Sequence, residues 1–265
     1  MKPARFEYSA PESVDAALAL LDDDAKPLAG GQSLIPMLNF RLARPARLVD
    51  LGRIGALAYL RRSGGVLRIG ALTRQVTLER SALLAAGWPL LRDAVAYVGH
   101  PAIRTRGTVG GSIAHADPAA ELPGALLALR AVFHVRSRRG ARTVAADAFF
   151  RGPMTTVLAP DELLCEIEVP ALPTGARCAF IEHARTHGDF ALGGAGVVIV
   201  PGSFASIAII GAGPVPRRCP EAESALVAGA SSMEVGRLAG AGVSDDYRRA
   251  LIGTLVERAV GRALA

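Results

Sequence analysis

The chain has 265 residues, of which 51% are hydrophobic and 20% charged, and this balance excludes an intrinsically disordered protein. Its formal net charge is +6, with 30 basic and 24 acidic residues. The basic residues are spread along the chain and only 5% of residues are aromatic, which argues against nucleic-acid binding. We expect an ordinary basic surface, or a face that docks acidic partner chains.

The three cysteines, Cys165, Cys178 and Cys219, form no C-x-x-C pair. They are too few to hold an iron–sulfur cluster through four thiolates. An odd number without a disulfide framework fits a reducing compartment, and the N-terminal residues lack the apolar core of a signal peptide. We therefore expect a cytoplasmic protein.

The first fifty residues predict a helix, followed by a strand, a glycine turn, a short helix and a second strand. Ser9 and Glu12 have the spacing of a capping box, and apolar residues from Val14 to Leu21 follow a helical period. The strands are expected at 27–29 and 47–51, with the short helix at 34–40 between them. These elements form a unit that ends near residue 55.

The next part of the chain mixes strands and helices up to a pair of prolines, Pro170 and Pro173. Thr73 is expected to cap a helix, and a hairpin is expected at 131–135 and 141–144. The other predicted elements are a strand at 66–69, helices at 90–98 and 119–129, and a strand at 163–169. The prolines mark the boundary with a third part.

The third part begins with strands and ends with helices, which is typical of an α+β domain. Residues 190–216 carry no charge and are long enough to cross a bilayer. Glycines and a Pro-Gly-Ser turn interrupt them, so we favour a buried hairpin at 197–200 and 205–210 over a membrane span. A strand at 178–183 precedes this hairpin and a helix at 245–264 closes the chain. The expected domains are 1–55, 56–172 and 173–265.

Two glycine turns carry the strongest functional signal. They are Ala29-Gly30-Gly31-Gln32-Ser33 and Thr108-Val109-Gly110-Gly111-Ser112. Glycine permits positive φ and close approach of the backbone to a ligand, and successive N–H groups in such turns form anion-binding nests. Two nests can hold the two ends of one diphosphate, so we expect a large phosphate-bearing cofactor. The P-loop and G-x-G-x-x-G patterns are both missing from the sequence.

Other polar residues give weaker signals. His183 and His187 have the spacing of two metal ligands on a helix, but they lie in a predicted strand and loop and no H-E-x-x-H is present. We expect polar surface or subunit contacts there, and no metal site. His115 either bonds the cofactor or orders the second turn, and Asp117 caps the helix that follows. No pattern indicates a nucleophilic catalyst.

Several segments together resemble a known family. The segments 26–37 and 103–118 resemble the two FAD-binding loops of the flavoprotein (medium) subunits of molybdenum hydroxylases. This family includes the carbon monoxide dehydrogenase type and the matching domain of xanthine dehydrogenase. Segments 162–170 and 184–191 are similar to the strand that closes the flavin domain and to a segment near the flavin ring. The resemblance covers nearly the whole chain.

The resemblance implies an α+β (α/β) fold, with a two-subdomain FAD-binding domain of the vanillyl-alcohol-oxidase (PCMH) type and a C-terminal domain of antiparallel sheet and helices. Backbone amides of 29–35 and 108–112 would hold the FAD pyrophosphate, with hydroxyl donors from Ser33 and Ser112. Glu121 would lie near the ribose, and Leu164 and Phe190 near the ring. The full set of implied cofactor-binding residues is Leu28, Ala29, Gly30, Gly31, Gln32, Ser33, Leu34, Ile35, Thr105, Gly107, Thr108, Val109, Gly110, Gly111, Ser112, His115, Asp117, Glu121, Leu164 and Phe190.

The resemblance further implies an electron-transfer subunit without catalytic side chains of its own. Electrons would reach FAD from iron–sulfur clusters and leave to an external acceptor. The implied partners are a large molybdopterin-binding subunit and a small [2Fe–2S] subunit, in a heterotrimer or its dimer. Two alternatives stay open, namely a self-contained flavin oxidase or reductase and a flavin-free assembly module. Neither the oxidised substrate nor the electron acceptor follows from the sequence.

Overall fold

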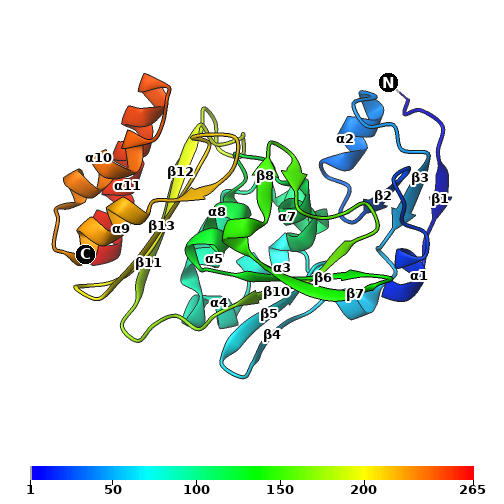
Figure 1. The fold of residues 1–265 in the computed structure, drawn as a ribbon, viewed down its shortest axis with the longest axis horizontal. Helices are drawn as coiled ribbons and strands as arrows, with labels where there is room; N and C mark the ends of the chain where they lie inside the picture. The colour runs from blue at the N-terminus through cyan, green and yellow to red at the C-terminus, as the bar shows by residue number, and fades with distance from the viewer. Residues whose placement is uncertain (1) are drawn as a thin grey trace.

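Three sheets follow one another along the long axis of the molecule. The structure, a computed structural model, describes residues 2–265. Figure 1 shows the N-terminal sheet at one end, a five-stranded sheet in the middle and a four-stranded sheet beside the C-terminal helices at the other end. The fold is a mixed α and β one, and each sheet in the described residues is open at both edges.

The N-terminal sheet is parallel. Its order is β1 (Glu7–Ser9), β3 (Arg47–Asp50), β2 (Ala25–Leu28), with α1 (Val14–Leu18) and α2 (Leu34–Asn39) in the connections. The predicted capping box is wrong, because Ser9 pairs with Val49 in the sheet. Ser13 caps α1 instead, and its side chain accepts a hydrogen bond from the Ala16 amide.

The central sheet is antiparallel throughout. The predicted hairpin and the predicted strand at 163–169 are both confirmed within it. Its order is β4 (Leu60–Ser63), β5 (Val66–Gly70), β10 (Leu163–Val169), β6 (Val132–Ser137), β7 (Gly140–Ala145). A short antiparallel pair, β8 (Phe150–Gly152) and β9 (Thr155–Thr156), follows β7.

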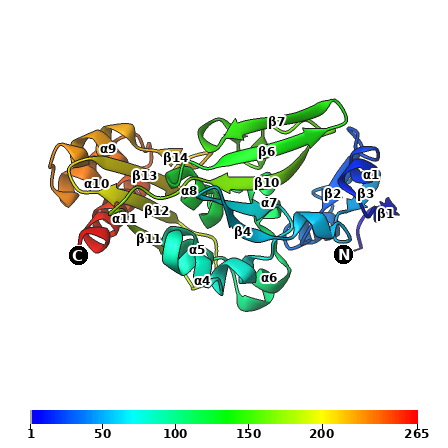
Figure 2. The ribbon, with the colours of Figure 1, turned by 90° about the horizontal axis from the view of Figure 1, so that it is seen from below.

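Helices cover one face of the central sheet. Figure 2 shows β6 and β7 on one side of the molecule and α4, α5 and α6 on the other. The helices of this layer are α3 (Gln75–Glu79), α4 (Ala82–Gly87), α5 (Pro89–Val95), α6 (Pro101–Arg106), α7 (Val109–His115) and α8 (Glu121–Ala128). The predicted cap at Thr73 is wrong. Arg74 occupies that position, because the buried Thr73 hydroxyl is bonded to the backbone of Tyr59.

The C-terminal sheet lies between two helical layers (Figure 1). Its order is β11 (Arg177–His183), β12 (Gly193–Val200), β13 (Phe204–Ile210), β14 (Arg217–Arg218). The helices α9 (Pro220–Val227), α10 (Ser232–Ala241) and α11 (Asp246–Leu264) pack on one face, and α5 and α8 pack on the other. The predicted uncharged hairpin is confirmed as β12 and β13. Within residues 2–265, no helix is both long and apolar enough for a membrane crossing.

The C-terminal sheet is packed closely against α8. A Cβ added at Gly124 would overlap the Cγ2 methyl of Ile210. The next residue, Gly211, donates its amide to the carbonyl of Pro118, just before α8, at 2.9 Å. We call this contact between the C-terminal sheet and the start of α8 the seam. Its close packing leaves little room for movement between the two. The domain division at 1–55, 56–172 and 173–265 stays a prediction, and each of the three larger sheets lies inside one of its parts.

Candidate functional site

The two glycine loops lie against each other. A Cβ added at Gly30 would overlap the carbonyl oxygen of Arg106 and would stand 2.9 Å from the Cα of Gly107. On the other side, a Cβ added at Gly111 would be 3.7 Å from the Cβ of Ala29. These contacts place the two loops side by side, and a shared cofactor site at them stays a prediction.

The first loop presents a row of unpaired backbone donors. Within the described chain, the amides of residues 30–34 have no backbone acceptor, and the first bond of the turn is from Ile35 N to Gly31 O at 3.1 Å. Gly31 has a φ of +73°, a conformation that glycine adopts without strain. Ser33 begins α2 without a side-chain capping bond, so its hydroxyl is also free. This arrangement is an anion-binding nest at a helix start.

The second loop differs from its prediction. It lies between two helices, α6 and α7. The amides of Val109 and Gly110 donate to the carbonyls of Thr73 and Ala71, at 2.9 and 2.8 Å. The next two amides donate to Thr108, to its side-chain Oγ1 from Gly111 and to its carbonyl from Ser112. These four amides are engaged within the protein, which corrects the expectation of a second free nest.

Close packing, and not positive φ, explains the glycines of the second loop. Gly110 and Gly111 do not have positive φ. A Cβ at Gly110 would stand 2.5 Å from the Cβ of Ala71, and one at Gly111 would stand 2.6 Å from Thr108 Oγ1. Only Gly31, of the four paired glycines, has the backbone conformation that the sequence analysis expected. The second loop is therefore held by close packing, and it borders the first loop.

Arg104 holds the second loop in place. Arg104 is buried, with only 5% of its surface exposed. Its Nε and Nη2 donate to the carboxylate of Glu79 at 2.9 and 3.0 Å, and its Nη1 donates to the carbonyls of Val98 and Gly99. Bidentate arginine–carboxylate pairs of this kind fix geometry as well as charge. Sequence reasoning missed this clamp, because its partners are 25 and 5 to 6 residues away.

Three predicted polar residues follow the second loop. His115 lies in the last turn of α7, and burial lowers its pKa below the usual value of 6.5. Asp117 Oδ1 accepts from the Ala119 amide at 2.8 Å. The predicted helix cap at Asp117 is wrong, because α8 begins at Glu121 with Ala120 as its N-cap. Glu121 begins α8 with only 7% of its surface exposed. Burial raises the pKa of Glu121 to about 7.

A third acid, Glu182 of β11, lies close enough for the charge of Glu121 to act on it. It was not expected from the sequence, since it looks like one polar position in a strand. Its Oε2 is sealed from solvent and has no hydrogen-bond partner among the described residues. Burial, with a contribution from the Glu121 charge, raises the pKa of Glu182 to about 8.

The remaining predicted residues have different environments. Leu164 is 6% exposed and belongs to the central core. Thr105 is on α6 and donates its hydroxyl to the carbonyl of Ala102. Phe190 is 74% exposed, in the loop between β11 and β12. The β11–β12 loop lies against His100, just before α6, since a Cβ at Gly188 would stand 2.5 Å from the His100 ring.

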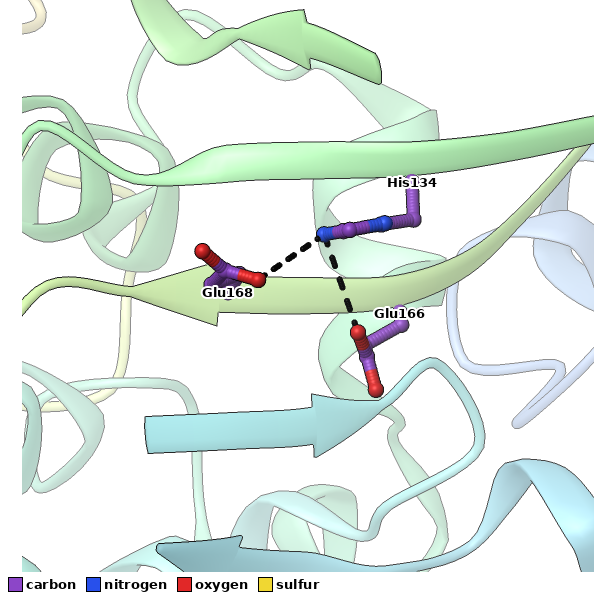
Figure 3. Close-up of side chains that lie close together, drawn as sticks. All are labelled: His134, Glu166 and Glu168. Carbon is purple, nitrogen blue, oxygen red and sulfur yellow. Dashed lines mark hydrogen bonds and ion pairs between the residues drawn. The ribbon is translucent and has the colours of Figure 1, made fainter. Parts of the chain in front are cut away.

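One further cluster has the composition of a metal site. His134, Glu166 and Glu168 converge on the outer face of the central sheet (Figure 3). However, Arg68 donates to Glu166 Oε1 at 2.5 Å and pairs with Glu168 Oε2 at 2.8 Å. The Tyr59 hydroxyl donates to the second oxygen of Glu166. The guanidinium therefore takes the place that a cation would need, and we interpret the cluster as an ion-pair network that ties β5, β10 and β6 together.

Comparison with known proteins identifies the family. Residues 4–172 match the model of the FAD binding domain in molybdopterin dehydrogenase. The chain belongs to the FAD-binding medium subunits of the molybdenum hydroxylases. It is 43% identical to the 6-hydroxypseudooxynicotine dehydrogenase complex subunit alpha of Paenarthrobacter nicotinovorans, with 100% of this chain and 96% of the relative covered. It is 38% identical to the carbon monoxide dehydrogenase medium chain of Hydrogenophaga pseudoflava, with 100% and 99% covered.

Solved structures agree with this assignment to the medium-subunit family. Carbon monoxide dehydrogenase from Hydrogenophaga pseudoflava superposes with a TM-score of 0.96 at 38% identity, covering 100% of this chain and 99% of the other. Quinoline 2-oxidoreductase from Pseudomonas putida 86 gives 0.93 at 34% identity, covering 99% and 98%. The cofactor of this medium subunit is FAD. The nest at residues 30–34 fits it, because unpaired amides at a helix start suit a diphosphate.

Proposed function

We propose that this medium subunit carries electrons through FAD, from iron–sulfur clusters on a partner chain to an external acceptor. The observation that carries the proposal is the contact between Gly30 and Gly107. This contact places the unpaired amides of the first loop beside the closely packed second loop. FAD supplies the electron-transfer chemistry when it is bound. The chain's own residues bind and orient it.

The proposed roles of the site residues follow from their surroundings. The amides of 30–34 and the Ser33 hydroxyl hold the diphosphate. Residues of the second loop contact the cofactor mainly through atoms other than the amides of 109–112, since these donate within the protein; the Ser112 hydroxyl is one such group. Glu121 lies beside the ribose, and Leu164 and the exposed Phe190 flank the ring. The remaining implied binding residues complete the contact surface as proposed from the family resemblance.

The cysteines support clusters on a partner chain. Burial raises the pKa of Cys165 and Cys219 to about 11 and that of Cys178 to about 12. Three cysteines are fewer than the four thiolates that such a cluster needs, and no potential metal-ligand group among the described residues contains a cysteine. We propose a large molybdopterin-binding subunit and a small [2Fe–2S] subunit as partners, in a cytoplasmic heterotrimer or its dimer.

The substrate belongs to the partner and not to this chain. Relatives of this medium subunit carry names that refer to carbon monoxide, caffeine and a nicotine derivative. Their names refer to different substrates, but their sequences are similar to this chain over most of its length. The same scaffold therefore serves complexes with different reactions.

Purification with and without the partner chains tests the function. The isolated chain should be yellow, with one FAD per chain, and should not oxidise an organic substrate. In the assembled complex, adding substrate should bleach the flavin absorbance. Turnover by the isolated chain would support the self-contained oxidase, and a colourless chain that takes up no FAD would support the assembly module.

A further inference from the structure

Glu182 is a half-buried acid of β11, in the sheet that packs against α5 and α8. In the β11–β12 register it lies opposite Gly194. It shares its face of the sheet with Phe180, which packs in the core formed with α5 and α8. Its Oε2 is closed off from solvent and accepts no hydrogen bond from the described residues. An ionised oxygen in such a position loses solvation without compensation.

Glu121 lies in the first turn of α8, and its charge acts on Glu182. Ile210 packs against Gly124, three residues after Glu121, and against Gly194, which lies opposite Glu182 in the sheet. Glu121 is almost fully buried, and no other described side chain is bonded to its carboxyl. The carboxyls cannot separate easily, because Gly124 packs on Ile210 and Gly211 is bonded to Pro118 within the same seam. Two neighbouring carboxyls with limited access to solvent do not both ionise readily.

We propose that Glu182 is a positioning residue of the FAD site, which shares protons with Glu121 and so keeps negative charge away from the bound cofactor. The proposal rests on the proposed place of Glu121 beside the ribose. Glu182 acts through Glu121 and does not itself touch the cofactor. A neutral Glu121 also has a proton with which to donate a hydrogen bond, which an ionised one lacks.

The charged groups around the pair define the pH range of its effect. Glu121 is also approached by Asp117 and Arg104, whereas Glu182 is approached by Glu121. Strands β12 and β13 contain no ionisable residue, and Asp93 of α5 acts on Cys178. The nearby His115 has a lowered pKa and is neutral above pH 7. A change between pH 7 and pH 8 therefore reports on the carboxyl pair.

FAD binding measured against pH tests this role. FAD is titrated into the flavin-free full chain from pH 6 to pH 9, and binding is followed by quenching of flavin fluorescence. The Kd of the wild type should rise in two overlapping steps as the carboxyls ionise beside the negatively charged cofactor, by about tenfold in total at effective dielectric constants near 20 to 40.

Three variants separate positioning from a merely structural role. Glu182→Gln should lose the step nearer pH 8 and keep the lower one, because Glu121 alone then ionises. Glu182→Asp should retain both steps. Glu234→Gln, which alters an exposed acid of α10 paired with Arg237, should behave like the wild type.

Several results would overturn the proposal. One is a Kd for the wild type that stays constant across this pH range, and another is a Glu182→Gln variant that retains both steps. Glutamine is the neutral isostere of a protonated glutamate, so a Glu182→Gln chain that fails to fold by circular dichroism also contradicts shared protons. A wild type without measurable FAD binding at any pH would refute the proposed function itself, and this inference with it.

Discussion

Gly30 and Gly107, from loops 77 positions apart in the sequence, meet so closely that neither loop leaves room for a side chain at Gly30. The nearest atoms are the Arg106 carbonyl oxygen and the Gly107 Cα. Both belong to the backbone, so they cannot rotate away as the end of a side chain would. The spacing between the loops is therefore set by this one contact.

Gly30→Ala should push the loops apart and weaken FAD binding at least tenfold, because the amides of 30–34 would no longer lie beside the second loop. The measurement is the Kd for FAD by fluorescence titration. Gly55→Ala is the matched control, since nothing lies within 4 Å of a Cβ there. Equal affinities for the two variants would show that the contact does not shape the site.

Gly31 tests the role of left-handed backbone. Its φ is +73°, where a residue with a Cβ is strained by about 1–2 kcal/mol. Asparagine tolerates this conformation better than branched residues. Gly31→Val should therefore lower the free energy of unfolding, measured in urea, by about 1 kcal/mol more than Gly31→Asn. A reversed order of the two variants would contradict the assigned conformation.

Removal of the Arg104 clamp should destabilise the protein strongly. Arg104→Leu leaves the Glu79 carboxylate without its partner and frees two carbonyls, a loss of about 2 kcal/mol for a pair in which the arginine is buried and the carboxylate is partly exposed. Arg237→Leu is the control, because its ion pair with Glu234 is exposed and such pairs contribute about 0.5 kcal/mol or less. Urea denaturation of both variants gives the comparison.

FAD occupancy separates two readings of an Arg104→Leu result. If the second loop depends on the clamp, flavin should be lost in conditions where the chain is still folded. Retention of flavin up to the unfolding transition would limit Arg104 to a general role in stability.

The stability of the flavin-free chain should fall as pH rises from about 4.5 to about 8. The pKa values of Glu121 and Glu182 are raised from 4.5 to about 7 and about 8. The folded chain therefore holds more protons than the unfolded chain in this interval, and its free energy of unfolding decreases with pH. The stabilisation is complete below pH 4.5 and lost above pH 8.

Glu182→Gln should remove part of that decrease, by about 2 kcal/mol between pH 5 and pH 9 after allowance for partial solvent exposure. Urea denaturation across this range provides the measurement. Glu79 has a lowered pKa because of Arg104, so it contributes in the opposite direction and below pH 4.5. A wild type whose stability rises through pH 7 would contradict the assigned shifts.

Some features of this medium subunit were determined by sequence alone. The strand at 163–169 and the uncharged hairpin follow from runs of apolar residues bounded by turn residues, because local hydrophobic patterns of this kind fit a buried strand. The last helix, predicted at 245–264, is confirmed as α11 (Asp246–Leu264), because its apolar residues follow a helical period. The two glycine loops were recognised because a glycine pair followed by a small hydroxyl residue is a compact pattern.

Only the tertiary structure decided what the glycines and several polar residues do. Gly30 and Gly110 exclude a side chain because of atoms far away in the sequence, namely the backbone of Arg106 and the Cβ of Ala71. Thr73 does not cap a helix, because the backbone of Tyr59 takes its hydroxyl. Glu182 meets Glu121 only when the C-terminal sheet packs on α8. Sequence patterns report periodicity and turns, whereas contacts between residues far apart depend on how the elements pack, and packing is not encoded in any local window of the chain.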